Sequence, residues 1–515
     1  MSTSKRIMIN SSFLYLKMIL TLFITLYTTR ILLEALGKSD FGLFNVIAGF
    51  TIMLTFFNIA LTTSSQRFMS VAQGEGVFSK QISIFNISIV LHMFAAILIA
   101  ILLKISGLYI FDGFLNIDSN RIESAKIVFN FVILTTVFGI LSVPFDASIN
   151  AHEKMIFIAI LGFCEAILNL SVALIIVNSD GDKLILYGIL LSIVGFFILI
   201  CKIVYVLNSF HESIINPIKY YDKSLFKEML NFSGWGLLSS SVSIVTSYGQ
   251  NILINIFFGT HANAAQGIAG QVAGQVGAIT KVFLIALNPV IFKSEGASNK
   301  GLFLQSIKSG SKVAFMSFSI LAIPMIIEME LLFKLWLKEV PEYAIIFCRL
   351  ILVTYILGQL TITVSSAISA TGKIKNFTIA FSLLGMVPFA ITYLLFKNGY
   401  SVESLYITYL NYEFFRTALL LYFGKIVCEI SIRDYFKDVI FKCLLIAITT
   451  ALTLLFIRHS IFESIFRVGL VFLASFVLNA VLYFAWGFSL SEKEVIKKLY
   501  RFIQSLIINK LRGPL

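Results

Sequence analysis

Charged residues are scarce in this sequence. Asp, Glu, Lys and Arg make up 13% of its 515 residues, whereas 58% are hydrophobic, and the mean hydropathy is +0.92. A water-soluble protein of this composition would have far too little polar surface. The scarcity of charge therefore excludes an ordinary soluble domain and indicates an integral membrane protein.

Cysteine is also scarce, and its positions follow no pattern. The five cysteines are widely spaced and mostly within apolar stretches: Cys164, Cys201, Cys348, Cys428 and Cys443. Such positions provide neither a disulfide framework nor a metal knuckle. We expect small residues that face lipid or the protein core, and we expect no metal or cofactor.

The motifs of soluble enzymes are missing. The sequence has no Walker A loop, no HExxH, no glycine-rich dinucleotide turn and no nucleophile elbow. The connecting loops are too short to house a catalytic domain. The segment NSDGDK at 178–183 holds two carboxylates, but Gly beside Asp and Asn predicts an ordinary turn. We therefore expect a protein that is not an enzyme.

The positive charge has a simpler explanation than nucleic acid. The net charge is +13, but Lys and Arg lie in short segments between apolar runs. That distribution is typical of residues that flank membrane helices. Since no nucleic-acid-binding motif accompanies the charge, a nucleic-acid partner is not expected.

Apolar runs long enough to cross a bilayer recur along the whole chain. Counting runs of about 20 residues gives about fourteen expected spans. They are 7–29, 41–63, 81–103, 125–147, 155–177, 184–207, 235–258, 264–290, 312–333, 343–368, 376–396, 402–424, 439–457 and 464–487. The first run is too long for a signal-peptide core and lacks a cleavage site, so we expect a retained helix. The predicted class is an all-α integral membrane protein.

Lys and Arg favour one side of the predicted membrane. Alternate loops hold roughly 24 of them on the side of the N-terminus and roughly 11 on the other. By the positive-inside rule both termini are cytoplasmic in this multi-pass protein.

The sequence repeats itself after about 220 residues. MINSS at 8–12 recurs as MLNFS at 229–233. Further matches pair Gly37 and Gly74 with Gly259 and Gly296, and Thr135, Gly139, Ile149, Ala151 and Lys154 with Thr354, Gly358, Ile368, Ala370 and Lys373. Because an even number of spans separates the copies, both have the same orientation. This predicts two six-helix lobes, 1–210 and 211–430, related by a pseudo-twofold axis along the membrane normal.

Two further segments follow the expected lobes. Residues 431–490 are predicted to form two additional membrane helices, and 491–515 a cytoplasmic tail. In the tail, Val495, Leu499, Phe502 and Leu506 fall on one helical face, with Lys497, Lys498 and Arg501 elsewhere. This pattern predicts a helix on the membrane surface, and a solvated tail is the alternative.

Ionisable residues recur near the middle of the expected spans. They are Lys17, His92, Glu165, Lys281 and Glu413. Charges facing lipid are costly, so such groups normally face a bundle interior or a wet cavity. We expect a polar cavity between the lobes where Lys17 and Lys281 attract an anion. His92, Glu165 and Glu413 are candidates for proton or cation coupling. The alternative is structural: Lys17 extends to the interface, or pairs with Glu165 only to hold helices together.

A glycine-rich segment lies within the eighth expected span. GQVAGQVG at 270–277 permits close helix approach or local bending. Gln266, Gln271 and Gln275 fall on or near one face of this helix, and amides on such a face would suit sugar hydroxyls. We place Gln271 and Gln275 in the candidate substrate site.

Three segments resemble a known family. They are LYTTRILLEALGKSDFGLFNV, SSQRFMSVAQGEG and NAHEKM. With the repeat and the spans, they are similar to bacterial lipid-linked oligosaccharide flippases of the Wzx type, in the multidrug/oligosaccharidyl-lipid/polysaccharide (MOP) superfamily. The resemblance covers nearly the whole chain and is most specific over residues 8–80.

The resemblance implies a function and its partners. It implies a flippase of the bacterial inner membrane that carries undecaprenyl-diphosphate-linked oligosaccharide by alternating access, without ATP hydrolysis, for O-antigen or capsule-like polysaccharide. Lys17 and Lys281 occupy the spans whose cations handle the diphosphate in this superfamily. Arg30 and Arg67 belong to the similar segments and lie at span ends, where they gate the lobes or anchor helices. Membrane lipid, H⁺ or Na⁺ as coupling ion, and other polysaccharide assembly proteins are the implied partners.

Two rival functions stay open. A cation-coupled multidrug exporter would share the lobes but would need an acidic cavity, and the two lysines argue against it. A membrane-embedded polymerase or acyltransferase of the same pathway is the other rival. Such a polymerase would be expected to carry a large periplasmic loop, which the sequence lacks.

Overall fold

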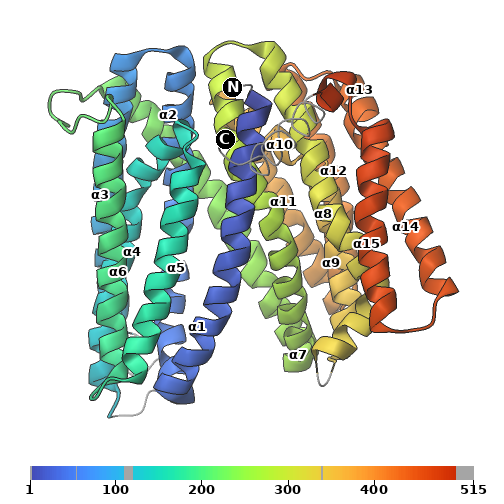
Figure 1. Cartoon of the computed structure of the whole chain (residues 1–515), viewed down its shortest axis with the longest axis horizontal. Helices are drawn as coiled ribbons and strands as arrows, with labels where there is room; N and C mark the ends of the chain where they lie inside the picture. Colours follow the sequence, from blue (N-terminus) through green and yellow to red (C-terminus); the bar gives the residue numbers. More distant parts are fainter. Residues whose placement is uncertain (1–2, 54, 110–119, 338–339, 495–515) are drawn as a thin grey trace, which may run out of the picture. The chain divides into compact units, whose positions relative to one another are not determined.

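The computed structural model describes residues 3–53, 55–109, 120–337 and 340–494 (Figure 1). Its first helices are α1 (Thr3–Met53), α2 (Thr55–Glu75), α3 (Phe78–Tyr109), α4 (Ile122–Ala151), α5 (Met155–Val177), α6 (Lys183–Ser209) and α7 (Lys223–Gly296). Then follow α8 (Lys300–Trp336), α9 (Ala344–Gln359), α10 (Ile362–Thr371), α11 (Lys375–Lys397), α12 (Ser404–Cys428), α13 (Ile432–Tyr435), the π-helix η2 (Phe436–Phe441), α14 (Lys442–Ser460), α15 (Ile465–Leu482) and the π-helix η3 (Tyr483–Gly487). Within the described residues every regular element is a helix, which confirms the all-α class.

Many of these helices are long and apolar enough to cross a bilayer. Ten of the described helices meet that requirement, or eleven if α9 and α10, bent by 45°, count as one broken span. The expected spans at 41–63, 235–258 and 402–424 are not among them, although their described residues are largely helical. The first of these runs is divided between α1 and α2 at residue 54, which lies outside the described residues. In the other two, polar side chains dilute the apolar character, as Glu413 and Arg416 do in α12. The predicted tail helix falls mainly on 495–512, outside the described residues.

The chain divides into two compact units. One comprises Ile9–Ser241 and Gly296–Ser298, and the other Met1–Met8, Val242–Glu295 and Asn299–Leu515. The first unit ends later than residue 210 because the first turns of α7 pack against α2. There the Ser64 hydroxyl donates to the Met229 carbonyl at 3.3 Å, and an added Cβ at Gly236 would lie 3.3 Å from the Cβ of Ala60.

The first unit is held together by two hydrophobic clusters. One joins α1, α2, α3, α4 and the start of α6, and includes Phe129, Val132 and Leu184. The other joins α1, α5 and α6 through residues such as Leu36 and Tyr187. Burial of these side chains is worth about 1.5–3 kcal/mol each against water, although lipid reduces that benefit for membrane helices.

The segment between α6 and α7 is fixed to the same unit. The Asn86 amide donates to the Ile214 carbonyl at 2.7 Å and accepts from the Asn216 backbone amide at 2.8 Å. The ring of His152, after α4, stacks on Phe210 with centroids 3.8 Å apart. The connection from α6 to α7 is therefore an ordered part of this unit.

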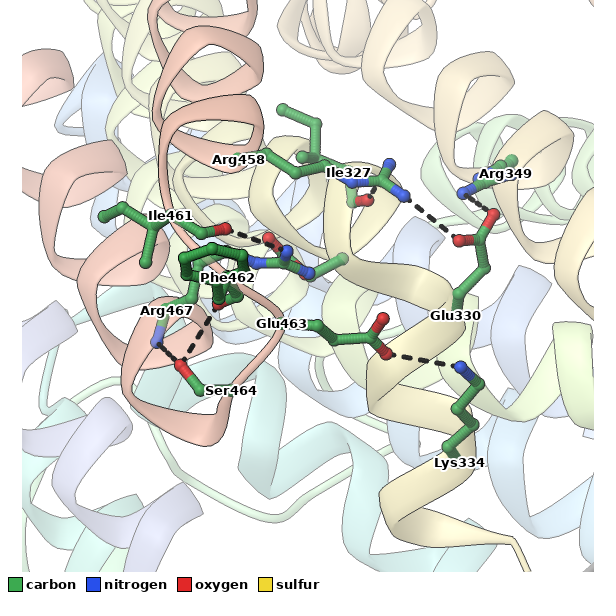
Figure 2. A network of polar contacts seen from close by, with 11 residues as sticks. Ile327, Glu330, Lys334, Arg349, Arg458, Ile461, Phe462, Glu463, Ser464 and Arg467 are labelled. Carbon is green, nitrogen blue, oxygen red and sulfur yellow. Dashed lines mark hydrogen bonds and ion pairs between the residues drawn. The ribbon is translucent and has the colours of Figure 1, made fainter.

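In the second unit α8 breaks at Glu328, and arginines from three other helices contact the break. Glu328 has φ −97° and ψ 16°, which is not helical. Arg349 of α9 donates to the Ile326 carbonyl at 3.1 Å, and Arg458 of α14 donates to the Ile327 carbonyl at 2.7 Å (Figure 2). The carbonyls near the break are thereby satisfied.

Carboxylates complete this cluster and attach α14 and α15 to α8. Glu330 pairs with both Arg349 and Arg458, at 3.1 and 3.0 Å. Glu328 pairs with Arg467 of α15 at 2.7 Å, and both side chains are buried. Helices α14 and α15 are thus tied to the second unit through α8, beside which Figure 1 draws them.

Left-handed backbone positions recur in the two copies of the repeat. Gly37 and Gly259 have φ of 76° at kinks inside α1 and α7, with ψ of 168° and −169°. Three more pairs of positive φ share nearly the same separation: Gly76 with Ser298, Glu153 with Gly372, and Gly181 with Gly399. Of the positive-φ residues in the described chain only Glu429 has no such counterpart. The repeated sequence therefore folds with repeated local geometry.

Candidate functional site

One face of α7 is polar and open. Lys281 lies near the middle of the candidate span Ala265–Gly296 and its side chain is exposed. Gln271 and Gln275 are also exposed on this stretch. At Gly267, Gly270 and Gly274 an added Cβ would meet no heavy atom within 4 Å. We call these residues the open face of α7.

The opposite face of the same stretch is apolar and buried. Ala265, Ala269, Val272 and Val276 belong to the hydrophobic core of the second unit. Glycine costs about 1 kcal/mol against alanine in a helix, so packing on this side has to offset the glycines of the open face. Packing of the buried face therefore fixes the orientation of the helix, and with it the position of the polar face.

Lys281 has no ion pair or hydrogen bond in the described part of the chain. An exposed ammonium at that depth would be costly against hydrocarbon, so it requires water or an anion. The open face consequently has the chemistry of a hydrated surface: a cation and two amides, with no large apolar side chain between them.

Gln266, the third glutamine of the predicted set, does not share this environment. It is buried and accepts a hydrogen bond from the Tyr406 hydroxyl of α12. The pair joins α7 to α12 inside the second unit. Sequence spacing alone did not separate this structural glutamine from its exposed neighbours.

Lys17 lies on α1 against α5. An added Cβ at Gly162 would collide with the end of the Lys17 side chain, so the absence of a side chain there makes room for the lysine. Glu165 is exposed three residues further along α5. The described residues contain no ion pair between Lys17 and Glu165. The lysine and the carboxylate therefore stay separate and each can meet a ligand.

His92 is enclosed within the first unit. Its ring is fully buried on α3, and Nδ1 lies 2.8 Å from the Ser88 carbonyl, while Nε2 has no partner in the described residues. This geometry fits a neutral imidazole with its proton on Nδ1. His92 is thus placed away from any exposed surface of its unit.

Glu413 is buried in α12 and paired with Arg416, one turn away. Both groups crowd Gly358 of α9, where an added Cβ would lie 3.2 Å from each. The i, i+3 spacing brings them onto one helix face and could have identified the arginine from the sequence. A buried pair of this kind leaves Glu413 neutralised.

The two arginines of the similar segments differ in environment. Arg30 is exposed near the middle of α1. Arg67 is buried, and its guanidinium lies 4.5 Å from the Phe68 ring and 5.0 Å from the Phe232 ring. Arg67 therefore contacts the start of α7, which favours the anchoring alternative for this residue.

The described residues offer no site for a metal held by protein ligands. They contain no group of three or more His, Cys, Asp or Glu side chains placed to coordinate an ion. An ion bound by the described residues would therefore have fewer than three His, Cys, Asp or Glu ligands.

Comparison with known proteins identifies the fold. No family model matches the sequence, and no curated protein matches it. Among solved structures, one described as MATE in the straight conformation has a TM-score of 0.71 at 12% identity, covering 83% of this chain and 97% of that chain. The MATE transporter ClbM in complex with Rb⁺ has a TM-score of 0.67 at 16% identity, covering 84% and 96%.

A third similar structure is a MOP superfamily transporter from Pyrococcus furiosus, whose description reports a binding pocket of reversed polarity that suggests a different function. It has a TM-score of 0.68 at 13% identity and covers 83% of this chain and 96% of that one. At these identities the likeness shows the fold. The chain has the fold of the MATE transporters of the MOP superfamily.

Proposed function

We propose that this protein is a membrane transporter that flips undecaprenyl-diphosphate-linked oligosaccharide by alternating access. The observation that supports it most is the open face of α7. There an exposed lysine without a partner among the described residues lies near the middle of a candidate span, beside two exposed glutamines. This combination suits a substrate with an anionic group and a sugar.

The charge of the substrate explains why such a face is needed. A diphosphate cannot cross hydrocarbon unaided, because desolvating its charge is prohibitively costly. Lys281 would meet the diphosphate through charge-assisted hydrogen bonds, and Gln271 and Gln275 would bind sugar hydroxyls. Lys17, which Gly162 accommodates, is the second cation that we propose for the diphosphate. The lipid tail would remain in the bilayer.

The resemblance to the Wzx family supports the substrate class and the setting. On this proposal the protein lies in the bacterial inner membrane with both termini cytoplasmic, and works with other proteins of polysaccharide assembly. We do not propose an enzyme, because the proteins that share its fold are transporters.

A cation-coupled multidrug exporter is the second candidate. Two observations favour it: the similar transporter ClbM was solved in complex with Rb⁺, and Glu165 presents an exposed carboxylate on α5. An acidic group could bind a cationic drug or a coupling cation such as H⁺ or Na⁺. In the flippase proposal, Glu165 would bind only the coupling cation.

Substitution of Lys281 tests the proposal. Reconstituted in vesicles with a fluorescent undecaprenyl-diphosphate oligosaccharide, Lys281→Met should lower the flipping rate at limiting substrate by about tenfold or more. The reason is the loss of charge-assisted hydrogen bonds, worth roughly 1.5–3 kcal/mol, where 1.4 kcal/mol is tenfold. Lys281→Arg should retain much of the rate, because it keeps the charge.

A control and a second probe complete the experiment. Lys397→Met, which removes an exposed lysine at the end of α11, should leave the rate unchanged at equal membrane level. Efflux of a cationic dye is measured in the same vesicles. Dye efflux without movement of the lipid-linked sugar would replace the flippase by the exporter. A normal flipping rate in Lys281→Met would contradict the role of Lys281 in binding the diphosphate.

A further inference from the structure

A second polar site lies in the second unit, away from the open face of α7. It is a cavity of about 350 Å³ where the start of α8, the segment α13–η2 and the residues after η3 meet. Its charged lining residues are Lys308, Lys312, Glu429, Asp434, Asp438, Lys442 and Glu492. A cavity of this size is within the range of small-ligand pockets, roughly 300–1,000 Å³.

Most of these charges already have partners. Lys308 pairs with Asp438 at 2.8 Å, and Lys312 pairs with Glu492 at 2.9 Å. Glu429 pairs with Lys300. The ion pair of Lys312 and Glu492 is nearly enclosed, since the two side chains are 4% and 10% exposed. A buried ion pair therefore fixes this part of the cavity wall.

Two side chains of opposite charge remain available. Lys442 and Asp434 line the cavity, and the described residues hold no ion pair of either side chain. The ammonium of Lys442 can donate to a phosphate, and the carboxylate of Asp434 can accept from a primary amine. With seven charged lining groups, of which four are acidic, the cavity disfavours a purely anionic ligand.

The position of the cavity identifies the source of such a ligand. It lies at one end of the candidate spans Lys300–Trp336 and Ile432–Ser460, and Glu492 follows the end of the span Ile465–Gly487. In a helix that crosses a membrane, such an end faces the lipid headgroups. Beside it, Phe441 and Trp486 are exposed, 55% and 59%, as aromatic side chains at a membrane interface are.

We propose that this cavity binds the headgroup of an aminophospholipid, with Lys442 on the phosphate and Asp434 on the amine. The acyl chains would lie against the exposed apolar side chains of η2 and η3. The proposal rests on the cavity and its charges, and does not depend on the flippase function.

Lipid binding to the full-length protein tests this site. Purified protein is titrated with phosphatidylethanolamine, phosphatidylcholine or phosphatidylglycerol and bound lipid is counted by native mass spectrometry. Phosphatidylethanolamine should bind about tenfold more tightly than phosphatidylcholine, whose quaternary amine has no N–H donor for Asp434. Equal binding of all three lipids would overturn the proposal, as would saturation by free phosphoethanolamine in place of the lipid.

Variants assign the two contacts. Asp434→Asn should remove the preference for phosphatidylethanolamine over phosphatidylcholine, and Lys442→Met should weaken both lipids by about tenfold. Lys442→Arg should bind as the unmodified protein does. Lys437→Met, on η2 but outside the lining, is the matched control. Unchanged lipid selectivity in Asp434→Asn, or unchanged lipid affinity in Lys442→Met, would contradict the assignment. If a variant fails to fold, the selectivity of the unmodified protein decides the proposal.

Discussion

Asp182 closes the NSDGDK turn and makes contacts beyond those of a turn. Gly181 adopts φ 92°, as the predicted turn requires. The Asp182 carboxylate accepts from the backbone amides of Leu184 and Ile185 at 3.0 and 3.2 Å, and so caps α6. It also pairs with Arg121 at 2.9 Å, before α4. The sequence predicted the turn, but the partner 61 residues away depends on how α4 and α6 pack.

The charge of Asp182 should contribute to stability in a pH-dependent way. Burial acts to raise its pKa, but hydrogen bonds from Ser124 and the Ile185 amide, together with the charge of Arg121, outweigh it and lower the pKa. Because the pKa is lower in the folded protein, the carboxylate contributes its full stabilisation at pH values above the pKa of the unfolded state, about 4. The stabilisation is lost as the pH falls through the lower pKa of the folded state. Asp182→Asn, which keeps an acceptor for the cap, should lower stability by about 1 kcal/mol at pH 7.

Thermal unfolding in detergent at pH 7 and at pH 3 measures this difference. The gap between Asp182→Asn and the unmodified protein should shrink at the lower pH. A gap that is the same at both values would mean that the carboxylate charge contributes nothing.

Single residues of the candidate site were predictable in position but not in surroundings. Apolar runs in the sequence placed Lys17, Lys281 and Glu413 within helices, and all three lie in helices of the structure. Their depth in the membrane remains a prediction. The sequence did not show that Gly162 makes room for Lys17, nor that Arg416 pairs with Glu413. Those contacts depend on helix rotation and side-chain direction, which an apolar sequence leaves weakly specified.

At the scale of elements, the break in α8 provides a direct comparison of a buried and an exposed ion pair. The pair of Glu328 and Arg467 is buried, with side chains 1% and 9% exposed. The pair of Glu463 and Lys334, drawn in Figure 2, is open to solvent, and its side chains are 51% and 65% exposed. Removing one partner of a buried pair leaves the other charge uncompensated, at a cost of about 3–5 kcal/mol. An exposed pair contributes about 0–1 kcal/mol.

Arg467→Met should therefore destabilise the protein much more than Lys334→Met does. Thermal unfolding in detergent gives the order, and the separation of α15 from α8 can be followed by a spin-label pair on the two helices. Equal effects of the two substitutions would show that Glu328 finds water or another partner when Arg467 is absent. The break itself was not predicted from the sequence, although Pro324 lies four residues before Glu328 in the same helix.

At the scale of the whole molecule, the repeat is visible in sequence and in backbone conformation. Sequence matches paired Gly37 with Gly259, and the structure gives both residues nearly the same φ and ψ. The sequence did not pair Glu153 with Gly372 or Gly76 with Ser298, because the residue types differ. Backbone conformation is retained where one copy has lost its glycine. Superposition of residues 8–207 on 229–424 remains a prediction.

The two kink glycines should respond alike to substitution. Their φ and ψ lie in a region that is essentially restricted to glycine, so alanine there costs about 1–3 kcal/mol. An added Cβ would meet no atom within 4 Å at Gly37 or Gly259, so the cost would be backbone strain and not collision. Gly37→Ala and Gly259→Ala should each lower the midpoint of thermal unfolding, and by similar amounts.

Gly139 provides the control, since it lies inside α4 with equally open space around it. Because its backbone is helical, Gly139→Ala should be neutral or should stabilise by about 0.5–1 kcal/mol. Thermal unfolding of the three variants in the same detergent makes the comparison. If one kink glycine tolerates alanine and the other does not, the two copies are not equivalent at this position. If both tolerate it, the kinks are not held in the conformation described here.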